Sequence, residues 1–274
     1  MSLAETRVEV DPANQAAQNR TFFTSIRPLA GLMLLGLCAG QPSSDALAAL
    51  PFFVGEKLTY DVSVNTGGKV GTGTMWVEGP IDVRGTSTYL LRFESKVRIA
   101  LFSGVSRSSS WFDPVRKASL RFLKHEKNPL ARDDVSVEMY PEEKKWKSAD
   151  GKMGDSPGDL PLDELSFMYF IRTLPLTPGA TLRFDRHFDA ARNPVVISVI
   201  RLETIPTPMG ELRTIRVEMR VRDPKHYKGD GLIRINFTDD QCRLPARIES
   251  TMPVVGKAVL TIKSGNASSQ CARR

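Results

Sequence analysis

The segment FDRHFD holds the strongest candidate for chemistry in this sequence, because two carboxylates flank an imidazole there. Asp185, His187 and Asp189 are each separated by one residue, and alternate side chains of a β-strand share one face. Such a group could bind a divalent metal or transfer protons. The competing interpretation is a hairpin end, because the Ala-Ala-Arg-Asn-Pro that follows is typical of a turn. We predict no metal site, and these three residues are the candidate ligands if the chain binds a metal.

Other features give little support for catalysis. Asp239 and Asp240 suggest calcium, but adjacent acids in a β-turn usually bond to nearby backbone amides. His125 and His226 stand beside lysines and are predicted to be surface residues. The sequence has no Gly-x-Ser-x-Gly, His-Glu-x-x-His or Cys-x-x-Cys motif and no phosphate-binding glycine loop. We therefore predict a non-enzymatic protein with no catalytic residue and no cofactor.

One apolar segment is predicted to be a helix. Asp159 is its expected N-cap, Pro161 lies in the first turn and Pro175 ends it. The residues between are apolar on nearly every side, which is typical of a buried helix. Two interpretations stay open, a core plug without a ligand role and a lid over a ligand cavity. For the second, the candidate lining residues are Leu165, Met168, Tyr169, Phe170 and Ile171.

Most of the remaining chain is predicted to form β-strands. Apolar and polar residues alternate in about a dozen segments, most regularly over residues 215–222. Turn sequences such as Lys228-Gly-Asp-Gly231 separate them, and the lack of helical crossovers excludes a parallel α/β sheet. We predict a mainly β fold, a strongly curved antiparallel sheet (half-barrel or barrel-like) with one buried apolar helix on its concave side.

The first fifty residues carry the features of an export signal. Arg20 and Arg27 precede an apolar run from Leu29 to Gly40, and Ala46-Leu47-Ala48 fits a signal-peptidase site. An uncleaved anchor is the main alternative, but the run is shorter than the roughly 20 residues that span a bilayer. A lipoprotein would need a small residue before Cys38, where Leu37 stands.

The predicted organisation follows from this signal. Residues 1–48 form an N-terminal lead and signal peptide with the cut after Ala48, residues 49–264 form one β-rich domain, and residues 265–274 form a C-terminal tail. The mature protein is expected in the periplasm or secreted.

Composition and charge narrow the classes of partner. The sequence is 41% hydrophobic and 25% charged, which is ordinary for a globular protein. Without residues 1–48 it keeps 35 basic and 27 acidic residues, a net charge of +8. In an exported protein this charge suggests anionic phospholipid or glycolipid, or else a solvated surface. The compartment argues against nucleic acid, an envelope protein partner stays open, and the oligomeric state is not predicted.

Two cysteines remain after export. Cys242 and Cys271 are candidates for one disulfide in an oxidising compartment. A loop of about 28 residues would make that bond worth about 3–4 kcal/mol on the chain-entropy model. The alternative is a free thiol in the tail.

Several stretches of the sequence resemble a known family. They are Pro51, Phe52, Gly55, Glu56, Leu58, Tyr60 and Val62, then Gly71 to Val77, Arg172 to Gly179, Thr207 to Gly210, Thr238 to Asp240, and Arg243 to Glu249. Over about residues 51–264 the chain resembles bacterial exported proteins catalogued as domain of unknown function 3108. The resemblance implies a β-rich, export-targeted single domain with no established activity. The expected architecture is also similar to the open half-barrel with an internal helix of periplasmic lipoprotein carriers, a likeness that says little about function.

Three functions fit these features. The first is an exported envelope protein that binds a lipid or other hydrophobic ligand in a cavity of the curved sheet. The second is a structural or assembly module that docks an envelope partner through a sheet edge. The third is a carboxylate hydrolase acting on envelope glycan or ester, which would need paired acids in a cleft.

Overall fold

The computed structural model describes residues 50–64, 68–99, 102–128, 131–222, 230–252 and 256–267. The predicted signal peptide and Cys271 lie outside these residues. Among the helices in the described ranges, none has the length and apolar character needed to cross a bilayer.

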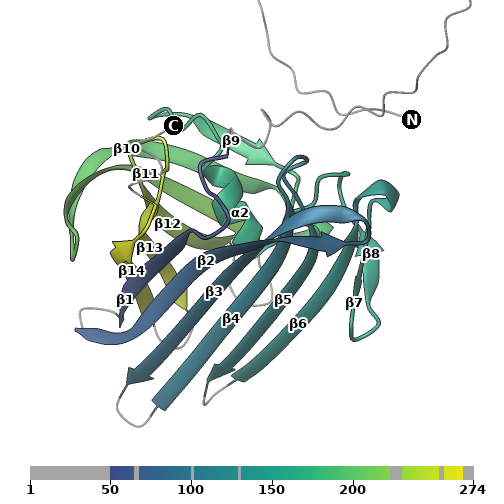
Figure 1. The fold of residues 1–274 in the computed structure, drawn as a ribbon, viewed down its shortest axis with the longest axis horizontal. Coiled ribbons are helices and arrows are strands. Elements are labelled where there is room, and N and C mark those ends of the chain that lie inside the picture. The colour runs from purple at the N-terminus through teal and green to yellow at the C-terminus, as the bar shows by residue number, and fades with distance from the viewer. Residues whose placement is uncertain are drawn as a thin grey trace, which may run out of the picture. The chain divides into compact units, whose positions relative to one another are not determined.

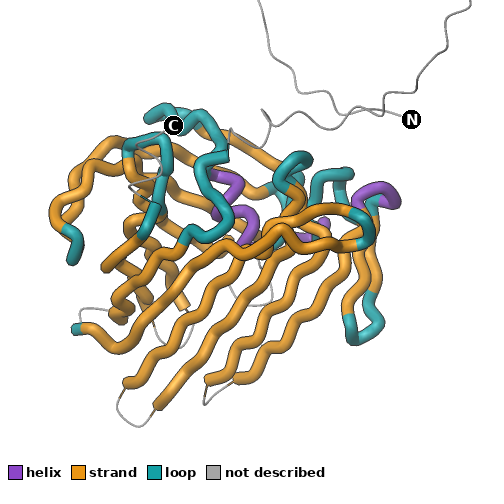
Figure 2. The backbone as a smooth tube through the Cα atoms, viewed as in Figure 1, coloured by secondary structure: helices purple, strands orange, loops and turns teal. Residues whose placement is uncertain are grey.

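Strands make up most of the described chain (Figure 2). The strands are β1 (Lys57–Val64), β2 (Lys69–Val83), β3 (Thr86–Ile99), β4 (Phe102–Asp113), β5 (Ala118–Asn128), β6 (Ala131–Tyr140), β7 (Lys145–Ser148), β8 (Met153–Asp155), β9 (Thr181–Phe184), β10 (Val195–Thr207), β11 (Gly210–Arg222), β12 (Asp230–Thr238), β13 (Pro245–Met252) and β14 (Gly256–Gly265). The described helices are α2 (Glu164–Ile171) and the short 3₁₀ turns η1 (Pro141–Glu143) and η2 (Ala190–Arg192).

All fourteen strands belong to one curved antiparallel sheet (Figure 1), which confirms the predicted fold class. The order is β8-β7-β6-β5-β4-β3-β2-β1-β14-β13-β12-β11-β10-β9. The first and last strands therefore pair in the middle of the sheet, and its two edges are the short strands β8 and β9. Because α2 connects β8 to β9, the helix belongs to the segment that runs from one edge of the sheet to the other.

Backbone and side-chain contacts of this segment hold the two edges near each other. Leu162 forms an isolated bridge with His187. The Arg186 guanidinium donates to the carbonyl of Leu160 (2.8 Å) and to that of Lys117, the residue before β5. The ring of Trp146 on β7 packs edge-on against Phe188 at 5.6 Å. The two edge strands β8 and β9 do not pair with each other, so the sheet is open. The contacts above close the gap between the two edges, which we call the seam.

The predicted alternation of buried and exposed residues is confirmed along the strands. In β11, Ile215, Val217 and Met219 are buried, whereas the alternate residues Arg216, Glu218 and Arg220 are half-buried or exposed. The buried side chains of both halves of the sheet form one core cluster together with α2. A helix can share a core with both halves only from the concave side of the sheet, where Figure 1 shows α2 between the two sets of strands.

The helix begins later than predicted. Its N-cap is Asp163, not Asp159, and it ends at Ile171, four residues before Pro175. Asp163 Oδ1 accepts from the amides of Leu165 and Ser166 at 2.9 Å, and Ser166 Oγ accepts from the amide of Asp163 at 2.8 Å. This reciprocal capping box satisfies the free amides of the first turn, which explains the start at Glu164.

The packed part of the chain continues past the last strand. The Asn266 side chain accepts from the amide of Lys57 and donates to the carbonyl of Gly55, both at 2.8 Å. Ala267 is fully buried. The first residues of the segment that the sequence assigns to a tail therefore belong to the domain.

Candidate functional site

The three residues of the FDRHFD candidate do not lie together on one strand face. Strand β9 ends at Phe184, so Asp185 lies beyond it and is exposed, whereas His187 is buried in the seam. Asp189 caps η2 by accepting from the amide of Ala191. Within the described ranges, no group of three or more histidine, cysteine or acidic residues could hold a metal ion. The segment from Asp185 to Asp189 is thus a connection between β9 and η2 that packs in the seam.

The environment of His187 favours its neutral form. Its Nδ1 accepts from the amide of Asp189 at 3.1 Å, and its buried Nε2 has no hydrogen-bond partner, 3.9 Å from Glu164 Oε1. Burial lowers the pKa of His187 to about 4, although the charge of Glu164 acts in the opposite direction. Protonation therefore opposes folding in the range between this pKa and the ordinary value of 6.5.

We expect this histidine to make the protein less stable in acid. In that pH range the unfolded chain binds the proton and the folded one does not, so stability falls as the pH falls. Between about pH 7 and pH 4.5 the wild type should lose about 2–3 kcal/mol more than His187→Asn, whose Oδ1 can still accept from Asp189. Urea unfolding at several pH values measures this difference.

A second buried group changes stability in the opposite direction but does not affect that comparison. Burial raises the pKa of Asp163 to about 6, despite the 2.5 Å hydrogen bond from Ser110. Its contribution grows as the pH falls, and it is common to both proteins. Parallel stability curves for wild type and His187→Asn would contradict the assignment to His187.

The five predicted lining residues of α2 lie in the core. Leu165, Tyr169, Phe170 and Ile171 are buried, and Met168 is half-buried against the same cluster. The two cavities of the described chain whose linings are known are formed by other residues. Their role in ligand binding stays a prediction.

An apolar cavity of about 130 Å³, the inner cavity, lies on the core-facing side of the sheet. Ser106, which lines it, is four residues along β4 from Ser110, the residue that bonds the helix cap, a distance of about 13 Å. The inner cavity is therefore separated from α2 along the strands. Its lining residues are Val62, Val64, Phe93, Ser95, Val97, Gly104, Val105, Ser106, Glu126, Lys127, Ala258 and Leu260.

Two glycines of β2 explain why space is left there. The cavity is lined from β1 and from β3, and β2 runs between these strands. Its residues Gly71 and Gly73 pair with Val97 and Ser95 of β3, so the row that crosses the cavity has no side chain on β2. At Gly73 an added Cβ would lie 3.2 Å from Leu260, which shows that this leucine packs over the glycine. Missing side chains thus create the hollow.

The inner surface becomes polar on the neighbouring strands. Ser106 on β4 pairs with Glu126 on β5, which pairs with Asp133 on β6. Lys124 Nζ lies 3.0 Å from the Glu126 carboxylate and 3.6 Å from that of Asp133. Burial alone would lower the pKa of Lys124, but the charges of Glu126, Glu164 and Asp133 outweigh it and raise that pKa.

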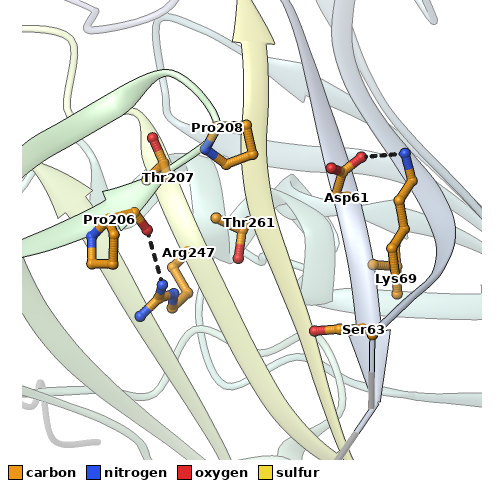
Figure 3. A pocket seen from close by; sticks show the side chains of 10 residues that line it. Asp61, Ser63, Lys69, Pro206, Thr207, Pro208, Arg247 and Thr261 are labelled. Atoms are coloured by element: carbon orange, nitrogen blue, oxygen red, sulfur yellow. Dashed lines mark hydrogen bonds and ion pairs between the residues drawn. The ribbon is translucent and has the colours of Figure 1, made fainter. Parts of the chain in front are cut away.

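A second, open groove of about 380 Å³ lies on the other face of the sheet (Figure 3). The tip of the β10–β11 hairpin, with Thr207 and Pro208, faces the outward side chains of β1, β13 and β14 across it. Asp61 and Lys69 form an ion pair of 2.8 Å at one side, and Arg247 donates to the carbonyl of Pro206 (3.1 Å) at the other. Charged side chains thus border this groove on both sides.

A buried ion pair joins two of the sequence stretches that carry the family resemblance. The Arg172 guanidinium makes two 2.7 Å hydrogen bonds to the Glu56 carboxylate, and both side chains are at most 1% exposed. It also donates to the carbonyls of Pro51 and Cys242. Cys242 is itself buried, with its Sγ 3.6 Å from the carbonyl oxygen of Ala267. The pair thus links segments that are far apart in the sequence within the core.

Sequence reasoning missed the residues of the inner cavity and its polar border. The signal was present in the alternate glycines at 71 and 73, because a glycine inside a strand often marks a close approach of another group. A run of small residues on the inward face of β4, from Gly104 to Ser110, was a second sign. Neither pattern predicts which other strands line the cavity.

Comparison with solved structures agrees with the observed fold. A β-barrel-like protein from Brucella abortus, of domain of unknown function DUF1849, is 12% identical with a TM-score of 0.56, covering 78% of this chain and 98% of its own. A candidate exported protein with a YmcC-like fold from Bacteroides fragilis is 14% identical over 79% and 98% of the two chains, with a TM-score of 0.29. A candidate lipoprotein from Parabacteroides distasonis is 10% identical over 80% and 99%, with a TM-score of 0.31. The last two scores are too low to support an argument.

The family assignment rests on the sequence. No curated relative matches the chain. The family model described as "Protein of unknown function (DUF3108)" matches residues 59–263, which run from β1 into β14 and include most of the sheet. The chain therefore belongs to the DUF3108 family of proteins of unknown function.

Proposed function

We propose that this protein is an exported cell-envelope protein that binds a lipid or another hydrophobic ligand in the inner cavity. The inner cavity is the observation that carries the proposal, because valines, Phe93 and Leu260 surround a space on the concave face. Burying apolar surface of a ligand there would contribute about 25 cal/mol per Å². The export signal expected in residues 1–48 supports the envelope as the compartment.

The size of the inner cavity suits one end of an apolar chain. About 130 Å³ is below the range of roughly 300–1,000 Å³ that is typical of drug-sized ligands. Beyond β13, half-buried apolar residues such as Val221 on β11 and Ile233 on β12 pack against the same core. A flexible acyl chain can place its end in the cavity, whereas a rigid ligand of ordinary size cannot.

Filling the inner cavity tests this function. Native mass spectrometry of protein purified from the envelope should show a lipid-sized adduct, and Ser106→Phe should lower the bound fraction at least about tenfold. The matched control is Ser109→Phe, the same change on the opposite face of β4, which should bind like the wild type. Absence of any adduct, together with no binding of added lipid, would contradict the proposal.

The other two functions have less support. The edges of the sheet are β8 and β9, of three and four residues, and short edge strands offer little surface for a docking strand. A hydrolase needs two carboxylates in different environments. Glu126 and Asp133 instead share one ammonium group, that of Lys124.

We also propose that Cys242 and Cys271 form a disulfide in the exported protein. Cys242 is buried, and its Sγ lies 3.6 Å from the carbonyl oxygen of Ala267, four residues before Cys271 in the sequence. The chain thus passes Cys242 shortly before it reaches the second cysteine. Non-reducing peptide mapping should recover the two cysteines in one linked peptide pair, and two free thiols would contradict the bond.

A further inference from the structure

The concave surface has an apolar side and a polar side that meet at the inner cavity. On β1 and β14 the cavity is lined by apolar residues such as Val62 and Leu260. On β4 and β5 it is lined by Ser106 and Glu126, and Asp133 follows in the same row on β6. A ligand that occupies the cavity therefore contacts a hydrocarbon-like wall and a carboxylate at once.

The polar side has more hydrogen-bond acceptors than donors. Each ionised carboxylate offers about four lone-pair sites and no donor, whereas an ammonium group has three donors. Lys124 is shared between Glu126 and Asp133, so most of the acceptor capacity of this pair is left unused. Because both carboxylates are about a third exposed, a bound ligand can reach them in place of water.

The charges of this region also favour a donor. Lys124 and Arg192 face three carboxylates, those of Glu126, Asp133 and Glu164. His187, beside Glu164, adds no positive charge near neutral pH because its pKa is about 4. Lys127 also lines the cavity, but it is exposed, so salt and water screen its charge.

His187, which lies beside Glu164, has a buried ring nitrogen without a hydrogen-bond partner. The Nε2 of His187 is buried and without a hydrogen-bond partner, and so is the Oε2 of Glu164. Among the described residues, the polar side thus continues from Glu126 through Lys124 and Glu164 to His187 with unfilled hydrogen-bonding groups. Buried polar groups are normally satisfied by protein, water or ligand.

From the apolar wall, the spare acceptors and the excess of carboxylates, we infer that the inner cavity takes amphiphiles whose head group donates hydrogen bonds. Such a head group is an ammonium or a set of hydroxyls, and an anionic head group is disfavoured. The inference rests on the proposed function and names the class of its ligand. The apolar chain lies against β1 and β14, and the head group reaches Glu126.

Three amphiphiles with the same twelve-carbon chain separate these possibilities. They are dodecylammonium, dodecyl maltoside and dodecanoate, each below its micelle concentration and titrated into the protein purified from the envelope. We expect dodecanoate to bind about tenfold more weakly than dodecylammonium. Glu126→Gln should weaken dodecylammonium about tenfold, leaving dodecanoate unchanged or stronger.

A matched variant controls for the loss of a surface carboxylate. Glu94 is 28% exposed and is held by Lys96 at 2.7 Å, much as Glu126 is 30% exposed and held by Lys124. Glu94 points to the face of the sheet opposite the inner cavity, so the Glu94→Gln variant should bind all three amphiphiles like the wild type. Asp133→Asn provides a second inward variant if Glu126→Gln folds poorly.

The outcomes distinguish the head-group inference from the proposed function. If the wild type binds none of the three amphiphiles, the proposed function fails, and the inference fails with it. If it binds all three equally, or dodecanoate most tightly, the cavity is confirmed and the head-group inference is overturned. Tight binding of dodecyl maltoside as well as dodecylammonium would support hydroxyls as the donors, and binding of dodecylammonium alone would support an ammonium.

Discussion

Replacing Glu56 with glutamine is expected to lower the free energy of unfolding by about 3–5 kcal/mol. The change keeps the shape of the side chain but removes the charge that neutralises Arg172. The guanidinium is at most 1% exposed and would stay buried with neutral acceptors alone, the glutamine amide oxygen and the carbonyls of Pro51 and Cys242. Urea unfolding of the wild type and the variant measures the difference.

Two further variants show whether burial of the charge is the cause. Asp150→Asn removes one partner of the exposed pair between Asp150 and Lys152, with side chains 54% and 76% exposed, and should change stability far less, because water screens this pair. The double variant Glu56→Gln with Arg172→Met should be more stable than Glu56→Gln alone, because no unpaired charge remains. A double variant less stable than the single one would contradict this account.

Introducing a carboxylate into the core side of α2 should have a similarly large effect. Phe167 is 1% exposed, and its ring packs edge-on against Phe170 at 6.1 Å. Phe167→Asp leaves an unpaired buried charge and a cavity, so it should cost about 3 kcal/mol or more. This loss is a large part of the stability of an ordinary domain. Thermal unfolding and the yield of exported protein measure it.

The choice of residue matters for this experiment. At Phe170 an aspartate would find a partner, because the Arg186 guanidinium lies 4.4 Å from the centre of that ring. Met153→Asp is the control, since Met153 is 73% exposed and the change should stay within about 0.5 kcal/mol. If Phe167→Asp folds and is exported like the wild type, α2 does not hold the core together.

Local patterns in the sequence predicted much of this fold. Alternation of apolar and polar residues identified strands such as β11 and the side of each that faces the core, because the period of two belongs to the backbone itself. The all-round apolar composition of residues 165–171 predicted a buried helix. The start of that helix was wrong by four residues, since both Asp159 and Asp163 are good caps and only Asp163 finds Ser110 and Ser166.

By itself, then, the sequence determined the class of fold, the faces of the strands, the single apolar helix and the family. The tertiary structure alone decided that β1 pairs with β14, that Glu56 meets Arg172 across 116 residues of chain, and that the glycines of β2 leave a hollow beside Glu126. The physical reason is that a local pattern specifies which way a side chain points, whereas its neighbours depend on strand order and register. Those are determined by the packing of the whole sheet around α2.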